Sequence, residues 1–147
     1  MSHAYARNYI HLTFGTKDRR CCLKPPVQDK LHPYLAGIAR EYGVEMLAIG
    51  GGEDHVHLLF ALPPKISLAA LVRALKANSS KWMNETGHFF AWQQGYGAFS
   101  VSASNLRAVS DYIRAQAKHH ARHSFEQEFF ALLTKHGIEF TPERVFG

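Results

Sequence analysis

The chain has 147 residues, of which 46% are hydrophobic and 20% are charged, and its Lys and Arg residues outnumber Asp and Glu by 17 to 12. This composition excludes an intrinsically disordered chain and predicts a single domain, residues 1–147, that is long enough to bury a core. The net charge of +5 favours a polyanionic partner such as nucleic acid, although an ordinary basic surface carries the same charge.

The sequence also argues against a membrane or disulfide-stabilised protein. No apolar run approaches the roughly 20 residues that span a bilayer, and the N-terminus lacks a secretory apolar segment. The two cysteines, Cys21 and Cys22, are adjacent, so they cannot cross-link the fold and lack the spacing of metal ligands. We therefore expect reduced thiols in a cytoplasmic protein without a membrane partner.

Hydrophobic periodicity and turn residues predict eight elements in the order β-α-β-β-α-β-α-α. These are strand 8–14, helix 25–42, strands 44–49 and 55–61, a helix capped by Ser67, strand 96–102, a helix capped by Ser104, and helix 125–135. The order predicts an α+β, ferredoxin-like split βαβ fold with a four-stranded antiparallel sheet and helices on one face. The other face is expected to be free for a ligand, and the tail 138–147 to dock through Phe140 and Phe146.

The most informative stretch is a glycine turn that leads into a strand with histidines at positions i and i+2. Side chains alternate along a strand, so His55 and His57 share one face, with α-carbons about 6.6 Å apart. Two such imidazoles can converge on one ion, as half of a metal site that needs a third ligand, although strands also place histidines on solvated faces for structural reasons. Glu53 and Asp54 are near enough, but acidic residues in a glycine turn need no functional reason.

A second pair of candidate functional residues lies on the helix after the fourth strand. Tyr112 and Gln116 are four residues apart, which places them on one helix face with about 6 Å of axial rise between them. A phenol can be a nucleophile, and an amide oxygen can bind a hard cation. By itself such a pair is typical of a helix surface.

His11 and Thr13 form one His-x-Thr motif. The two-histidine phosphoesterases need two such motifs, and the second is missing from this sequence.

Taken in order, these motifs resemble those of the single-tyrosine HUH transposases, which serve the smallest bacterial insertion sequences, and of their relatives the REP-associated tyrosine transposases. The resemblance extends from about residue 5 to residue 135. It is carried by four segments: the basic loop Thr16-Lys17-Asp18-Arg19-Arg20, the His-Val-His strand at 55–57, the segment Gly95-Tyr96-Gly97-Ala98-Phe99-Ser100, and the Tyr-Ile-x-x-Gln helix at 112–116.

The resemblance implies a DNA transposase that cuts and rejoins single-stranded DNA. Tyr112 would be the catalytic nucleophile and form a 5′-phosphotyrosine intermediate, while His55, His57 and Gln116 would hold Mg²⁺ or Mn²⁺. Nitrogen ligands suit Mn²⁺ better than Mg²⁺. The family works as a homodimer on DNA folded into hairpins, and in many members the tyrosine helix completes the partner's active site.

Basic and aromatic residues are the expected DNA contacts. The predicted phosphate contacts are Lys17, Arg19, Arg20 and Lys24 in the loop and Arg73, Lys76 and Lys81 on the helix capped by Ser67. Trp92 and Tyr96 are candidates for base stacking. Lys118 or His120 is an accessory candidate for activating the tyrosine. Two alternatives stay open: a non-catalytic nucleic-acid-binding module and a metal-dependent phosphodiesterase in which Tyr112 is incidental. The presence of both histidines, the tyrosine and the glutamine favours catalysis.

Overall fold

The structure is a computed structural model, and it describes residues 4–87, 89–116 and 123–146. Its strands are β1 (Tyr9–Gly15), β2 (Met46–Gly51), β3 (His55–Ala61) and β4 (Gly97–Val101). Its helices are α1 (Pro25–Glu41), α2 (Leu68–Glu85), α3 (Leu106–Arg114) and α5 (Phe125–Lys135). Short 3-10 turns cover Lys17–Arg19, Ala103–Asn105 and Pro142–Arg144.

The four strands form one antiparallel sheet in the order β2-β3-β1-β4. The two central strands, β1 and β3, are the first and third in the chain, as the split βαβ pattern requires. The predicted α+β fold with a four-stranded antiparallel sheet is therefore confirmed. In this register Gly15 pairs with His55 and Thr13 with His57, so the histidine pair lies on a central strand, near one end of the sheet.

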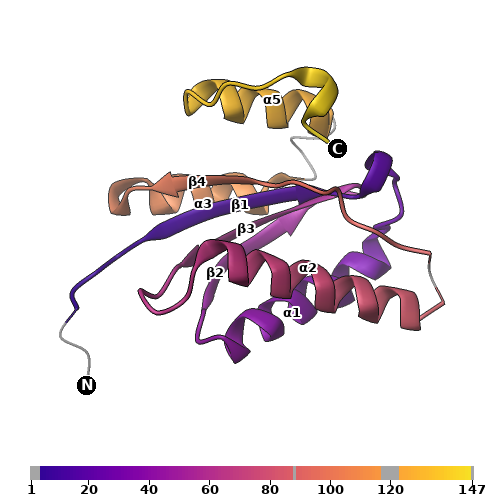
Figure 1. The fold of residues 1–147 in the computed structure, drawn as a ribbon, viewed down its shortest axis with the longest axis horizontal. Helices are drawn as coiled ribbons and strands as arrows, with labels where there is room; N and C mark the ends of the chain where they lie inside the picture. Colours follow the sequence, from indigo (N-terminus) through magenta and orange to yellow (C-terminus); the bar gives the residue numbers. More distant parts are fainter. Residues whose placement is uncertain (1–3, 88, 117–122, 147) are drawn as a thin grey trace.

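Helices α1 and α2 cover one face of the sheet (Figure 1). The alternating side chains of β3 meet them there, and Val56, Leu58 and Phe60 are fully buried in this core. Local sequence sets the helix ends: two prolines occupy the first positions of α1, and the Ser67 hydroxyl caps α2 by accepting a hydrogen bond from the Ala70 amide at 3.1 Å. Alternation along β3 then sends His55 and His57 to the opposite face.

Helices α3 and α5 lie on that opposite face (Figure 1), so the expectation of a second face free for a ligand is wrong. Ile113 of α3 is fully buried against Ala48 of β2 and Leu59 of β3. Phe125 and Phe129 of α5 form another cluster with Phe99 of β4. The C-terminal helices therefore close the second face, and α3 brings the predicted tyrosine to it.

Two details of the C-terminal half bear on the predictions. The tail docks as expected, because Phe140 and Phe146 are partly buried against the α5 cluster. The predicted cap of α3 is wrong: Ser104 lies inside the preceding 3-10 turn, and Asn105 occupies the N-cap position.

Across the part of the chain that the structure describes, no helix combines the length and the apolar character needed to cross a membrane.

Candidate metal centre and nucleophile

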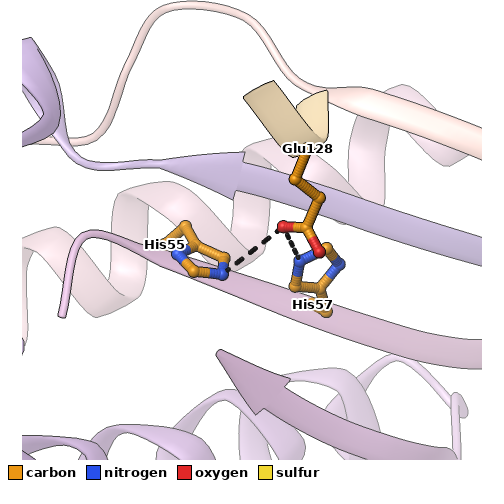
Figure 2. A group of neighbouring side chains, drawn as sticks. All are labelled: His55, His57 and Glu128. Atoms are coloured by element: carbon orange, nitrogen blue, oxygen red, sulfur yellow. Dashed lines mark hydrogen bonds and ion pairs between the residues drawn. The ribbon is translucent and has the colours of Figure 1, made fainter. Parts of the chain in front are cut away.

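The site begins with the two histidines of β3, which are both fully buried. The Nε2 atom of His57 lies 2.9 Å from Oε1 of Glu128, and the Nε2 atom of His55 lies 3.7 Å from the same oxygen. Figure 2 shows the carboxylate reaching down from α5 between the two rings. One ligand atom from each of the three residues lies within 4.8 Å of the others, a grouping that can hold a metal ion.

Glu128 was missed by the sequence analysis, which considered only Glu53 and Asp54 as acidic neighbours of the pair. It lies 71 positions from His57 in the chain and is 4% exposed. A weak signal exists in the sequence, since Glu128 falls on the same helix face as Phe125 and Phe129. A carboxylate on an apolar helix face needs a buried partner, and here the histidines are that partner.

Each histidine has its other ring nitrogen held by a second group. The Nδ1 atom of His55 lies 2.8 Å from a carboxylate oxygen of Asp54, and the Nδ1 atom of His57 lies 2.8 Å from Nε2 of His11. Such partners fix the tautomer of a metal-binding histidine and leave the opposite nitrogen for the ion. Burial and the neighbouring His57 lower the pKa of His11 to about 3, so His11 is a neutral imidazole that can accept this hydrogen bond.

Tyr112 projects from α3 toward the same point. Its hydroxyl donates a hydrogen bond to Oε2 of Glu128, and its ring meets that of His57 edge-on with centroids 5.9 Å apart. Burial raises the pKa of Tyr112 well above its usual value, and the hydrogen bond to Glu128 adds to the effect. The phenol is therefore held neutral and oriented when Glu128 is ionised.

Gln116 bridges the two halves of the site. Its amide oxygen lies 3.0 Å from Nε2 of His55, and its amide nitrogen donates to Oε2 of Glu128 at 3.1 Å. The structure thus brings together His55, His57, Tyr112 and Gln116 within one chain and adds Glu128 to them. The accessory candidates Lys118 and His120 lie outside the described residues.

Two glycines allow this close assembly. A Cβ atom at Gly50 of β2 would lie 2.0 Å from the carbonyl oxygen of Ile113, so α3 touches the strand backbone directly. A Cβ atom at Gly15 of β1 would lie 2.7 Å from the ring of Phe125 in α5. The absence of a side chain at these positions lets both C-terminal helices approach the sheet closely enough for Tyr112 and Glu128 to reach the histidines.

The donor set fits a divalent cation. Two imidazole nitrogens, a carboxylate oxygen and an amide oxygen are all neutral or anionic donors, and their mixture of nitrogen and oxygen suits Mn²⁺ or Mg²⁺. The amide and the second carboxylate oxygen keep the Tyr112 hydroxyl beside these ligands. The arrangement places a potential nucleophile next to a potential metal ion.

The predicted DNA contacts of the basic loop have varied surroundings. Lys17 is exposed, Lys24 forms an ion pair with Glu53, and Arg20 lies over the ring of Phe89 at 5.8 Å. Arg19 is 3.2 Å from the Glu126 carboxylate and also lies over the ring of the tail residue Phe146. The loop that carries these cations is thus connected to the C-terminal helix above the site.

On α2, Arg73 and Lys81 are exposed, as expected of phosphate contacts. Lys76 differs, because its amine donates hydrogen bonds to the backbone carbonyls of residues 93, 94 and 95 at 2.6 to 3.2 Å. Burial lowers the pKa of Lys76 to about 8. The amine of Lys76, predicted to contact phosphate, instead holds the segment before β4.

The aromatic candidates for base stacking differ in their exposure to solvent. Trp92 is 8% exposed and its indole nitrogen donates to the Ser79 hydroxyl at 2.9 Å, so it belongs to the core and the stacking prediction for it is wrong. Tyr96 is 39% exposed. Phe89, which was not predicted as a contact, is 85% exposed beside the basic loop.

An antiparallel ferredoxin-like sheet with a buried His-x-His pair and a tyrosine helix on the same face defines a small class of proteins, and comparison with known families identifies which one. The model of the IS200-like transposases matches residues 4–116. The chain therefore belongs to the IS200-like transposase family.

The individual proteins that this chain resembles are also named as transposases. The ISDra2 transposase TnpA of Deinococcus radiodurans is 29% identical over 122 residues, which cover 78% of this chain and 86% of that protein. The transposase of insertion sequence IS200 from Salmonella typhimurium is 25% identical, with 79% and 81% covered.

Solved structures show the same fold. A crystal structure assigned as a transposase from Deinococcus radiodurans R1 has a TM-score of 0.64 and 28% identity, and the match covers 77% of this chain and 93% of that one. A REP-associated tyrosine transposase bound to a REP hairpin has a TM-score of 0.59 and 19% identity, over 77% and 68% of the two chains. The second likeness shows a shared fold.

Proposed function

We propose that this transposase cuts and rejoins single-stranded DNA through a covalent bond between Tyr112 and the 5′ phosphate. The observation that carries the proposal is the convergence of the Tyr112 hydroxyl, both histidine Nε2 atoms and the Glu128 carboxylate within one chain. A protein that only binds DNA has no need of a buried phenol hydrogen-bonded beside three potential metal ligands.

His55, His57 and Glu128 would hold the divalent ion, with the amide oxygen of Gln116 as a fourth ligand. The ion, when bound, supplies Lewis-acid stabilisation of the charge that develops on the phosphate oxygens. Mn²⁺ or Mg²⁺ fits this mixed set, and the imidazole nitrogens favour Mn²⁺ in affinity. His11 and Asp54 act behind the ligands by holding the Nδ1 atoms.

The chain's own residues account for the rest of the step. The Tyr112 oxygen attacks phosphorus, a new bond between phosphorus and the phenol oxygen forms, and the bond to the 3′ oxygen breaks. That oxygen leaves with the electron pair and takes a proton from water, which frees a 3′-hydroxyl. Oε2 of Glu128 accepts the phenol proton, because the hydroxyl already donates to it, while Oε1 faces the histidines. Attack by another 3′-hydroxyl on the phosphotyrosine reverses the step, so rejoining needs no ATP.

The DNA partner is proposed to be a single strand that folds into a hairpin. The related REP-associated transposase is bound to a REP hairpin, and this chain presents Lys17, Arg20, Arg73 and Lys81 as exposed cations for the phosphate backbone. Each subunit has one Tyr112, so handling two strand ends requires two subunits, and we propose a homodimer. Because one chain holds all the groups of the site, such a dimer would pair two complete sites.

The proposal is tested by incubating the protein with single-stranded DNA from the ends of an insertion sequence and Mn²⁺, followed by denaturation and gel analysis. The wild type is expected to form a covalent adduct, Tyr112→Phe none, and Tyr42→Phe, at an exposed tyrosine after α1, as much as the wild type. DNA cleaved without an adduct would support the phosphodiesterase alternative instead. DNA that is shifted in a native gel but stays intact would support the binding module.

A further inference from the structure

A cavity of about 520 Å³ lies beside the proposed nucleophile, between β4, α3 and α5. Tyr112 and Glu128 both line it, so the hydrogen bond between them lies at its wall. Among the described residues the lining includes neither His55 nor His57. The volume falls in the range of roughly 300–1,000 Å³ that is common for small-ligand sites. The cavity therefore adjoins the proposed nucleophile, and His11, the hydrogen-bond partner of His57, also lines it.

The lining is suited to a flat heterocycle. The rings of Phe99 and His136 are stacked on each other with centroids 4.4 Å apart, so Phe99 is covered and the exposed His136 is the ring that a base can reach. Val109 of α3 and Leu132 of α5 add aliphatic surface. Proteins hold unpaired nucleobases between aromatic and aliphatic side chains of this kind.

The polar groups at the cavity match the rest of a nucleotide. Asn105 lines it and is the N-cap residue of α3, yet its side chain makes no capping hydrogen bond. An asparagine amide offers a donor and an acceptor, which is what the edge of a base requires. Lys135, an exposed cation at the end of α5, also lines the cavity and complements a phosphate. An apolar peptide would leave both groups unused.

We propose that this cavity receives an unpaired nucleobase next to the phosphate that Tyr112 attacks, and that it selects the cleavage site by the identity of that base. The inference rests on the proposed function, since it takes the Tyr112 hydroxyl as the point of attack. Single-stranded DNA gives up little stacking when one base turns into a pocket. A base held there fixes its own phosphate beside the phenol and so supplies orientation as well as selectivity.

The first test measures binding with simple probes. The four deoxynucleoside 5′-monophosphates, the base-free deoxyribose 5-phosphate and indole are titrated into the full chain, and contacts are detected by saturation-transfer NMR. Ala131→Trp fills the cavity from an exposed position of α5, and Thr134→Trp is the control, because Thr134 is exposed on the same helix and outside the lining. Asn105→Ala removes the proposed base-reading amide.

We expect saturation of the base protons, a preference of about tenfold for one base that weakens in Asn105→Ala, and a loss of about tenfold in affinity in Ala131→Trp alone. Deoxyribose 5-phosphate that binds as well as the nucleotides would overturn the proposal. So would unchanged binding to Ala131→Trp, equal binding of all four bases, or binding of indole without any nucleotide.

The covalent-adduct assay separates this proposal from the proposed function. Ala131→Trp is expected to form the adduct about tenfold more slowly than the wild type and Thr134→Trp. If all three proteins form it equally fast, the cavity has no role in cleavage although the transposase function stands. If the wild type forms no adduct, the proposed function fails and the cavity proposal fails with it.

Discussion

Gly50 offers a sharp test of how the tyrosine helix is seated. It lies on β2, pairs with His57 in the sheet, and has no positive φ angle, so its backbone would accept any residue. A Cβ atom at this position would nevertheless lie 2.0 Å from the carbonyl oxygen and 2.9 Å from the carbonyl carbon of Ile113. These are backbone atoms of α3 and cannot rotate away, so Gly50→Ala must displace the helix.

The size of the effect follows from the geometry. Ordinary contact with a Cβ atom begins near 3.4 Å, so α3 must move by about 1.4 Å at Ile113. Overpacking of this kind costs about 1–3 kcal/mol of stability. Tyr112 precedes Ile113 and shifts with it, and a displacement of about 1 Å at a reacting group can lower a rate about 100-fold. We expect Gly50→Ala to lose both stability and the rate of adduct formation.

The control is Gly37→Ala on α1, where an added Cβ atom has nothing within 4 Å. An alanine in a helix is favoured over glycine by about 0.5–1 kcal/mol, so this variant is expected to be slightly more stable and fully active. Urea unfolding gives the stabilities, and time courses of the DNA adduct give the rates. If Gly50→Ala retained wild-type stability and rate, α3 would not be seated directly against β2 and this reasoning would be refuted.

Three further predictions concern the site and the basic surface. His11→Phe keeps the ring but removes the partner of the His57 Nδ1 atom, so titration calorimetry should show Mn²⁺ binding weakened about 10- to 100-fold; unchanged affinity would exclude the orienting role. Lys76→Met should lower the free energy of unfolding by about 1–3 kcal/mol, since three backbone carbonyls lose a donor. Lys81→Met should leave stability unchanged, and it should reduce by about 0.7 the slope of the logarithm of the DNA-binding constant against the logarithm of the salt concentration. The reverse outcome for the two lysines would contradict their assigned surroundings. Glu128→Gln should weaken Mn²⁺ binding and slow adduct formation in the same assays, and removal of the metal with a chelator should abolish adduct formation. A fully active variant would show that the carboxylate is dispensable.

The strand with the two histidines and the helix 125–135 could be predicted from the sequence because their signals are local. Alternation places His55 and His57 on one face, and a capping box at Ser124 with Gly137 at the far end delimits α5. The N-cap of α3 was missed because Ser104 is a good capping residue by type, yet a 3-10 turn shifts the helix start to Asn105.

The rest of the site depends on distant contacts that no local pattern encodes. Periodicity places Glu128 on the inner face of α5, but only the packing of that helix over the sheet shows that it meets His57. The same holds for Trp92, whose aromatic character fits a stacking surface as well as the core in which it lies. The second face was expected to be open because the fold pattern alone does not say where the C-terminal helices dock.

The measurement that tests the central claim most directly is a crystal structure of the protein soaked with Mn²⁺, with anomalous data collected near the manganese absorption edge. The account predicts one strong anomalous peak within coordination distance of the Nε2 atoms of His55 and His57 and the carboxylate of Glu128, with the Tyr112 hydroxyl of the same chain beside it. A peak elsewhere, or none at saturating Mn²⁺ while His57 stays hydrogen-bonded to Glu128, would contradict it.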